Sequence, residues 1–309
     1  MSTTLDPPTS STARAATPAR RPVAHHRRAI VGFTAPFLAL FCLFYVLPIG
    51  YAVFQSFLKI ERATTFGPPT EVFAGLEQYL SVLRSESFWT SLGRVGSLLV
   101  TMVPLAIALG LVFALLIDSP VIKGKRFFRL AFFAPYAVPS VIAAIMWGNF
   151  YAPTLSPLPG IATSLDLLNP GGIMIALVNI VVWTVAGFNM LIMYSSLQAI
   201  PQELYEAARI DGASQFRLAL TIKVPLITPA IIMTAVLSII GTLQLFNEPT
   251  VLKSLSKAIG LDFTPNMLVF NTASIPNYNL AAAYSVMLAI FTAILSFVFL
   301  RLTQKRAFA

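Results

Sequence analysis

The sequence has few of the residues that most enzymes use for chemistry. Among 309 residues it contains one cysteine, Cys42, and two histidines, His25 and His26, and only 11% of the positions are charged. One cysteine excludes an intramolecular disulfide, and two neighbouring histidines near the N-terminus argue against a histidine-based catalytic or metal centre. The phosphate-binding pattern GxxxxGK(S/T) is absent as well, so any ATP that the protein uses must be bound by another chain.

Long apolar runs make up most of the chain. Hydrophobic residues account for 57% of the positions, and several runs reach the roughly 20 residues that a helix needs to cross a bilayer. We therefore expect an all-α, polytopic membrane protein with six transmembrane helices. They are predicted at about residues 29–58, 90–117, 127–151, 172–197, 222–247 and 280–302.

The basic residues are distributed unevenly along this pattern. Residues 1–28, rich in Ser, Thr, Ala, Pro and Arg, are predicted to form a disordered basic tail. This tail, the second and fourth connections and the C-terminal end, together with the span ends next to them, hold 15 of the 21 Lys and Arg residues. Cytoplasmic segments of membrane proteins carry such an excess, so both termini are predicted to be cytoplasmic. The same asymmetry explains the net charge of +9 without a nucleic-acid partner.

Charged residues are missing from the middle of the predicted spans. Proton- or ion-coupled carriers place such residues at membrane depth, so the energy source is expected to lie outside this chain. A channel would need a ring of charge or a filter sequence, and a membrane-embedded enzyme would need a catalytic dyad; neither is visible. The two longest outer connections, at about 59–89 and 248–279, offer a surface for a soluble partner or serve as simple linkers.

One polar stretch, Tyr205–Pro229, interrupts the apolar pattern: YEAARIDGASQFRLALTIKVPLITP. It predicts a short helix, a turn and a second short helix, because Gly212 tolerates the backbone angles of a sharp turn. Asp211 is expected to cap the second helix, and Ala207 and Ala208 have so little bulk that another surface can approach closely. An ordinary helical hairpin between two spans is the simpler interpretation.

The order of residues in this stretch favours a more specific interpretation. Glu-Ala-Ala, three residues, Gly, nine residues and Ile-x-Val-Pro resembles the coupling-loop signature of permease subunits in binding-protein-dependent ABC importers, of the maltose and glycerol-phosphate type. Ile210-Asp211-Gly212-Ala213 is similar to the sugar-uptake branch of that family. The resemblance covers about residues 29–305, with the coupling loop at about 202–221. Val224 stands where the family usually has Leu, and the family's Gly-Gly-Pro turn is missing after Pro249.

The resemblance implies a transport subunit that carries out no catalysis itself. Its partners would be a second homologous permease, two ATPase subunits that bind ATP and Mg, an extracytoplasmic solute-binding protein and the membrane lipid. The ATPase would be contacted by the residues of the loop signature, which are Glu206, Ala207, Ala208, Asp211 and Gly212.

The spans also carry neutral polar and aromatic groups, which suit a hydroxyl-rich ligand such as a sugar or oligosaccharide. The resemblance implies substrate contacts on the third, fourth and fifth spans. By their distance from Glu206, the expected pocket residues on the fourth and fifth spans are Trp183, Thr184, Ser238 and Thr242, and Trp147 on the third span is a looser match. Helix–helix packing and interfacial aromatic belts are the simpler explanation for any one of them. A permease for glycerol phosphate or a polyamine is the alternative function, disfavoured by the lack of charge in the spans.

Overall fold

The computed structural model describes residues 24–62, 68–275 and 277–307 and divides the chain into two units, residues 1–51 and 52–309. In the first unit, α1 (Ala24–Phe41) continues through a π-helical turn, η1 (Cys42–Val46), into α2 (Leu47–Gln55). Residues Val31–Gln55 are long and apolar enough to cross a membrane. The helix thus begins five residues before the expected position, and residues 1–23 of the predicted tail lie outside the described residues.

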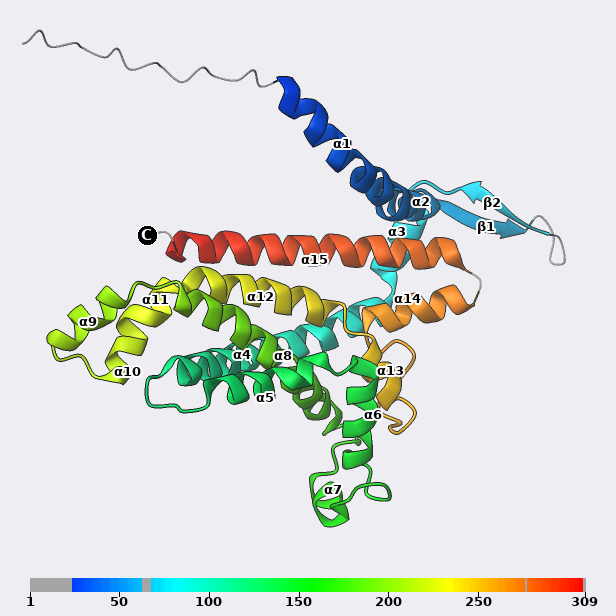
Figure 1. Cartoon of the computed structure of the whole chain (residues 1–309). Coiled ribbons are helices and arrows are strands. Elements are labelled where there is room, and N and C mark those ends of the chain that lie inside the picture. Colours follow the sequence, from blue (N-terminus) through cyan, green and yellow to red (C-terminus); the bar gives the residue numbers. More distant parts are fainter. Residues whose placement is uncertain (1–23, 63–67, 276, 308–309) are drawn as a thin grey trace, which may run out of the picture. The chain divides into compact units, whose positions relative to one another are not determined.

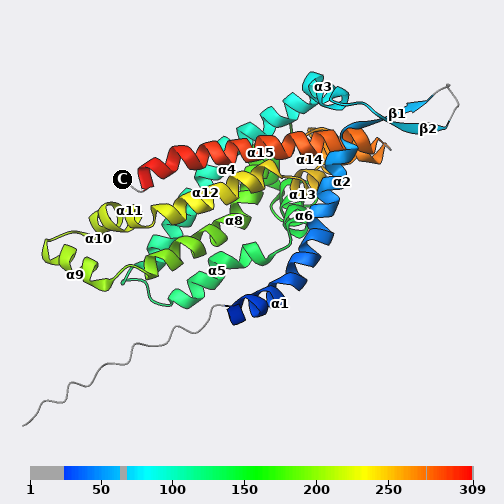
Figure 2. The same cartoon turned by 90° about the horizontal axis from the view of Figure 1, so that it is seen from above.

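Four long helices form the body of the second unit (Figures 1 and 2), and each corresponds to a predicted span. They are α4 (Glu86–Asp118), α8 (Ile173–Gln198), α12 (Thr228–Leu243) and α15 (Tyr278–Ala307). Helix α4 lies along α8 and also contacts α12, which in turn contacts α15. Together with Val31–Gln55, the described residues contain five separate helical segments that could each cross a membrane.

The third predicted span, 127–151, is not continuous. It consists of α5 (Lys125–Ala137) and α6 (Ser140–Tyr151), which meet at an angle of 94°. Val138 adopts an extended conformation between them, with φ −76° and ψ 124°, because the ring of Pro139 disfavours the α conformation for the residue before it. The bent pair is a broken span or a re-entrant loop; counted as one span, it brings the described residues to the six spans expected.

Shorter elements connect the long helices. The predicted connections missed an antiparallel hairpin, β1 (Leu58–Arg62) and β2 (Pro69–Phe73), in which Leu58 lies opposite Phe73. The connecting helices are α3 (Glu77–Arg84), α7 (Pro159–Leu165), α9 (Gln202–Ile210), α10 (Gln215–Leu218), α11 (Val224–Leu226), α13 (Asn247–Leu252) and α14 (Pro265–Ser274), and a second π-helical turn is η2 (Ala219–Lys223). Helices α9 and α10 project from one end of the second unit, whereas α13 and α14 lie near the other (Figure 1).

Helix α8 packs closely against α5 because one position has no side chain. A Cβ atom on Gly187 would lie 1.9 Å from the backbone oxygen of Phe132 and 2.9 Å from the Cα of Phe133. Backbone atoms cannot move aside as a flexible side chain can. Small residues at helix contacts allow this kind of close approach in membrane proteins.

We expect Gly187→Ala to lower the thermal stability of the detergent-solubilised protein, because α5 and α8 must separate to admit the methyl group. Overpacking of this kind costs about 1–3 kcal/mol. Gly241→Ala in α12 is the matched control, since no atom lies within 4 Å of the Cβ it would gain. Equal melting temperatures for the two variants would contradict the close packing of α5 on α8.

Candidate functional site

The polar stretch forms the predicted helix–turn–helix. Four of the five expected coupling residues are exposed: Glu206 and Ala207 on α9, and Asp211 and Gly212 in the turn. The fifth, Ala208, is buried and belongs to the apolar cluster at this end of the unit. Helix α9 therefore uses one face to pack on its own chain and leaves the other open.

Two large apolar side chains on this loop were not identified by sequence reasoning. Ile210 is 86% exposed and Phe216 is 75% exposed. They stand near the ends of α9 and α10, next to the exposed turn. Isolated apolar residues in a polar loop are the signal that could have drawn attention to them. An exposed face with small, acidic and apolar residues is suited to docking another protein.

The turn between the two helices has the hydrogen bonds of a Schellman motif. The Gly212 amide donates to the oxygen of Arg209 at 3.0 Å, and the Ala213 amide donates to the oxygen of Ala208 at 2.9 Å. Gly212 has a φ of +79°, the left-handed conformation that this motif requires after the helix end. The sharp turn predicted at Gly212 is thereby confirmed.

The expected helix cap is wrong. Asp211 ends α9, and the side chain that caps α10 belongs to Ser214, whose hydroxyl accepts from the Arg217 amide at 3.3 Å. The Schellman turn uses Gly212 and Ala213 before the chain re-enters a helix, so the residue at the N-terminus of α10 is three positions later than expected. Ser is among the preferred residues at this position.

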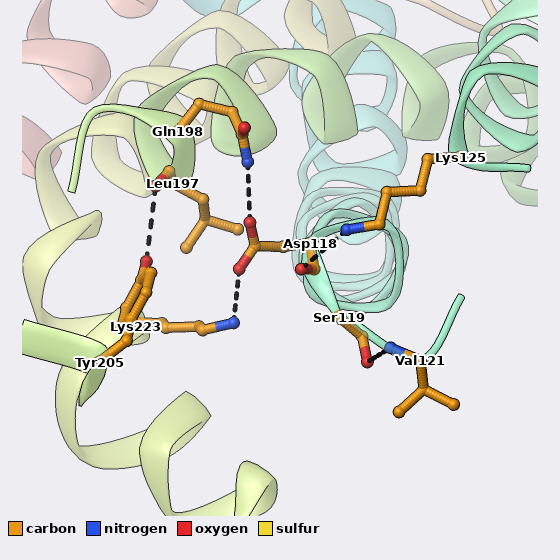
Figure 3. Close-up of polar contacts among 8 residues, drawn as sticks. All are labelled: Asp118, Ser119, Val121, Lys125, Leu197, Gln198, Tyr205 and Lys223. Atoms are coloured by element: carbon orange, nitrogen blue, oxygen red, sulfur yellow. Dashed lines mark hydrogen bonds and ion pairs between the residues drawn. The ribbon is translucent and has the colours of Figure 1, made fainter. Parts of the chain in front are cut away.

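A buried ion pair joins the base of the loop to the helices (Figure 3). Lys223, the last residue of η2, binds the carboxylate of Asp118 at the end of α4, and the side chains are only 7% and 8% exposed. The other carboxylate oxygen of Asp118 accepts a hydrogen bond of 2.8 Å from Gln198, the last residue of α8. In addition, Lys125 donates to the backbone oxygen of Asp118 at 3.2 Å. Four segments therefore meet at Asp118: η2 and α8 at its carboxylate, and α5 at its backbone oxygen.

Tyr205 connects α9 to the same cluster. The ammonium group of Lys223 lies 5.1 Å from the centre of the Tyr205 ring, a cation–π contact, and the Tyr205 hydroxyl donates to the oxygen of Leu197 at 3.5 Å. Burial, and secondarily the charge of Asp118, raise the pKa of the Tyr205 phenol, so it stays neutral and remains a donor. Tyr205 thus links α9 to the ends of α4 and α8. Sequence reasoning missed this cluster because Asp118 and Lys223 lie 105 residues apart.

A cavity of about 510 Å³ lies between α4, α5, α8 and α12, extending to the start of α13. The rings of Tyr136 and Phe188 stack in its wall with centroids 4.6 Å apart. Six lining residues carry amide, hydroxyl or carboxylate groups: Asn189, Ser238, Thr242, Gln244, Asn247 and Glu248. Aromatic faces and neutral polar groups are the components that bind hydroxyl-rich small molecules.

The structure does not bring the five expected pocket residues together. Ser238 and Thr242 line this cavity, and the Thr242 hydroxyl donates to the backbone oxygen of Ser238 at 2.8 Å. Trp183 lines a separate cavity with residues of α4 and α5, and Trp147 packs edge-on against it at 5.7 Å. Thr184 lines neither cavity, and its hydroxyl donates to the oxygen of Ile180 at 2.8 Å.

Helical rotation explains why Trp183 misses the cavity. Val181 and Val185 of α8 line it, and each residue of a helix is turned by about 100° from its neighbour. Trp183 is therefore about 200° away from both valines and points to the opposite side of α8. Counting along the sequence from Glu206 gives the position of a residue along the helix axis, but not the side of the helix that it faces.

Glu248 is an ionisable residue in the cavity wall. Sequence reasoning ended the fifth span at residue 247 and so placed Glu248 outside it. In the structure the apolar segment continues from α12 into α13, to Leu252, which moves the carboxylate into the span. Among the described residues, no group of three or more His, Cys, Asp or Glu side chains could hold a metal ion.

Comparison with known proteins agrees with this geometry. A family model described as "Binding-protein-dependent transport system inner membrane component" matches residues 102–305. The chain is 31% identical over 289 residues to the trehalose/maltose transport system permease protein MalF of Thermococcus litoralis, covering 91% of this chain and 96% of that protein. It is 32% identical over 222 residues to the sn-glycerol-3-phosphate transport system permease protein UgpA of Salmonella choleraesuis, covering 68% of this chain and 71% of that protein.

A solved structure shares the fold. A bacterial ABC transporter involved in the import of the acidic polysaccharide alginate superimposes with a TM-score of 0.76 at 17% sequence identity. The match covers 91% of this chain and 96% of that chain. The chain therefore shares its overall fold with a chain of that transporter.

Proposed function

Because the chain belongs to the family of inner membrane components of binding-protein-dependent transport systems, we propose that it is the permease subunit of an ATP-driven importer for a sugar or oligosaccharide. It is a multi-pass membrane protein and a transport component, not an enzyme. A second homologous permease completes the translocation path, two ATPase subunits bind ATP and Mg, and an extracytoplasmic binding protein delivers the substrate.

The coupling loop is the observation that carries this proposal. Its buried side, with Tyr205 and Ala208, is fixed to the helix ends through the Asp118–Lys223 pair, while Glu206 and Ala207 stay exposed. A loop held this firmly can pass a movement of the ATPase on to α4 and α8. The helices then rock about the cavity, which opens alternately to either side of the membrane.

The cavity favours a sugar over the alternative substrates. Lys, Arg and His are absent from the residues that line it, whereas a phosphate group calls for such cations. A polyamine carries several ammonium groups, and Glu248 is the one carboxylate in this wall. Stacked aromatic rings beside amides and hydroxyls match the apolar faces and hydroxyl groups of a sugar.

Uptake measurements on the reconstituted complex test this function. The chain, its companion permease, the ATPase and the binding protein are placed in vesicles, and entry of radiolabelled trehalose, maltose and glycerol 3-phosphate is followed with and without ATP. We expect ATP-dependent entry of a neutral sugar. Entry of glycerol 3-phosphate alone would contradict the proposal.

The pocket residues provide a second prediction. Thr242→Val and Gln244→Leu remove polar groups from the cavity, and each should raise the KM for sugar uptake about fivefold, the equivalent of one hydrogen bond of about 1 kcal/mol. Trp183→Ala, outside the cavity, should lower the melting temperature and leave KM unchanged. A raised KM for Trp183→Ala alone would instead support the pocket expected from the sequence.

The orientation in the membrane gives a third prediction. Reporter fusions at residues 125 and 212 should show a cytoplasmic location, and a fusion at residue 70, in β2, should show the opposite side. The reason is the excess of basic residues in the segments assigned to the cytoplasm. A cytoplasmic signal from the fusion at residue 70 would overturn this topology.

A further inference from the structure

We propose that Glu248 sets the charge selectivity of the cavity, so that it admits neutral or cationic hydroxylated ligands and excludes those that carry phosphate or carboxylate groups. This inference rests on the proposed function, in which the cavity is the transport site. It adds the substrate class, because the relatives include a permease named for a phosphorylated compound, and the fold is shared with an importer of an acidic polysaccharide.

The position of Glu248 is fixed by the packing of α13. Asn247 donates to the hydroxyl of Ser140 at the start of α6, at 2.9 Å, and Pro249 and Leu252 of α13 are buried. Gly148 of α6 makes room for this contact, since a Cβ there would lie 3.0 Å from the side chain of Leu252. Helix α13 is thereby anchored on α6, and Glu248 is held at the cavity wall.

No neighbouring cation neutralises this carboxylate within the described part of the chain. Glu248 is half-buried, and its carboxylate accepts a hydrogen bond from its own backbone amide but forms no ion pair with a described residue. Lys, Arg and His are missing from the cavity wall. Of the nearest cations in sequence, Lys253 and Lys257 are exposed and do not line the cavity. Arg94 is engaged elsewhere, with the oxygen of Asp262 at 3.2 Å and the ring of Phe263.

The chemistry of a single unpaired carboxylate accounts for both halves of the selectivity. A carboxylate accepts strong hydrogen bonds from hydroxyl groups, so it binds a neutral sugar well. It repels another anion, and the repulsion is stronger in a partly desolvated wall than in water. A role confined to the first turn of α13, where acidic residues stabilise a helix, would produce neither effect.

The electrostatic effect of Glu248 on the cavity can be measured without knowing which sugar is transported. In the full chain, assembled with its partners in membrane vesicles, Cys42→Ser removes the one native cysteine, and Gln244→Cys places a thiol on the cavity wall. The rates of its modification are then compared for two methanethiosulfonate reagents of similar size, one with a trimethylammonium group and one with a sulfonate group. The ratio of the two rates reports the charge of the cavity.

We expect Glu248→Gln to lower the cationic-to-anionic rate ratio about three- to tenfold, the effect of one unit charge at several ångströms, and Glu248→Lys to lower it further. Glu71→Gln, an exposed carboxylate on β2, is the control and should leave the ratio unchanged. An unchanged ratio with Glu248→Gln would overturn the proposal, as would a thiol that neither reagent reaches. The assay needs no transported substrate, so a failure to find sugar uptake would leave its result standing.

Discussion

Lys223→Met should destabilise the protein by about 3–5 kcal/mol and release the ATPase from the complex, because it leaves the carboxylate of Asp118 buried without a counter-charge. The substitution has two effects. The unpaired carboxylate destabilises the folded end of α4, which thermal unfolding in detergent measures. Tyr205 loses the cation beside its ring, so α9 is held less firmly, and co-purification of the ATPase measures this second effect.

Two further variants separate the buried pair from a general effect of charge. Lys123→Met removes a nearby exposed lysine and should change stability by no more than about 0.5 kcal/mol. The double variant Asp118→Leu/Lys223→Met removes both charges and should recover most of the stability, since a buried ion pair can be replaced by apolar residues at little cost. A double variant less stable than Lys223→Met would contradict the account of the pair.

Glu206→Lys and Gly212→Asp should each abolish ATP-driven uptake while the chain still inserts into the membrane. Glu206 is exposed on the free side of α9, where charge reversal turns an attraction to the ATPase into a repulsion that can cost several kcal/mol. Gly212 has a φ of +79°, which costs a residue with a Cβ about 1–2 kcal/mol. Insertion depends on the apolar spans, which neither change affects.

Matched substitutions test whether the effect belongs to the loop. Glu71→Lys reverses an exposed charge on β2 and should leave uptake intact. Gly212→Asn should be milder than Gly212→Asp, because Asn tolerates the left-handed conformation better and adds no charge. Normal uptake with both Glu206→Lys and Gly212→Asp would show that the loop is only a connector between two helices.

The features that the sequence predicts well are those set by local composition. Helices α4 and α8 agree with their predicted spans within a few residues, because a run of apolar residues bounded by polar ones has clear ends. The turn at Gly212 follows from the conformational freedom of one residue. These features depend on short segments and not on how the segments pack together.

The features that escaped prediction depend on packing. Pro139 breaks the third span, yet Pro104 lies inside the continuous helix α4, so proline alone does not identify a break. Helix α8 is apolar on all sides, so its sequence does not show that Val181 faces the cavity and Trp183 faces away. The pairing of Asp118 with Lys223 requires the folded arrangement of α4 and η2.

Photo-crosslinking from the α9–α10 loop shows whether this loop docks an ATPase. A photoreactive amino acid is placed at Ala207, on the exposed side of α9, and at Thr163, exposed on α7, as the control. After irradiation of native membranes, the covalent partners are identified by mass spectrometry. We expect position 207, and not position 163, to capture a subunit that contains the phosphate-binding pattern GxxxxGK(S/T). Folded, membrane-inserted protein that captures no such subunit from position 207 would contradict the account.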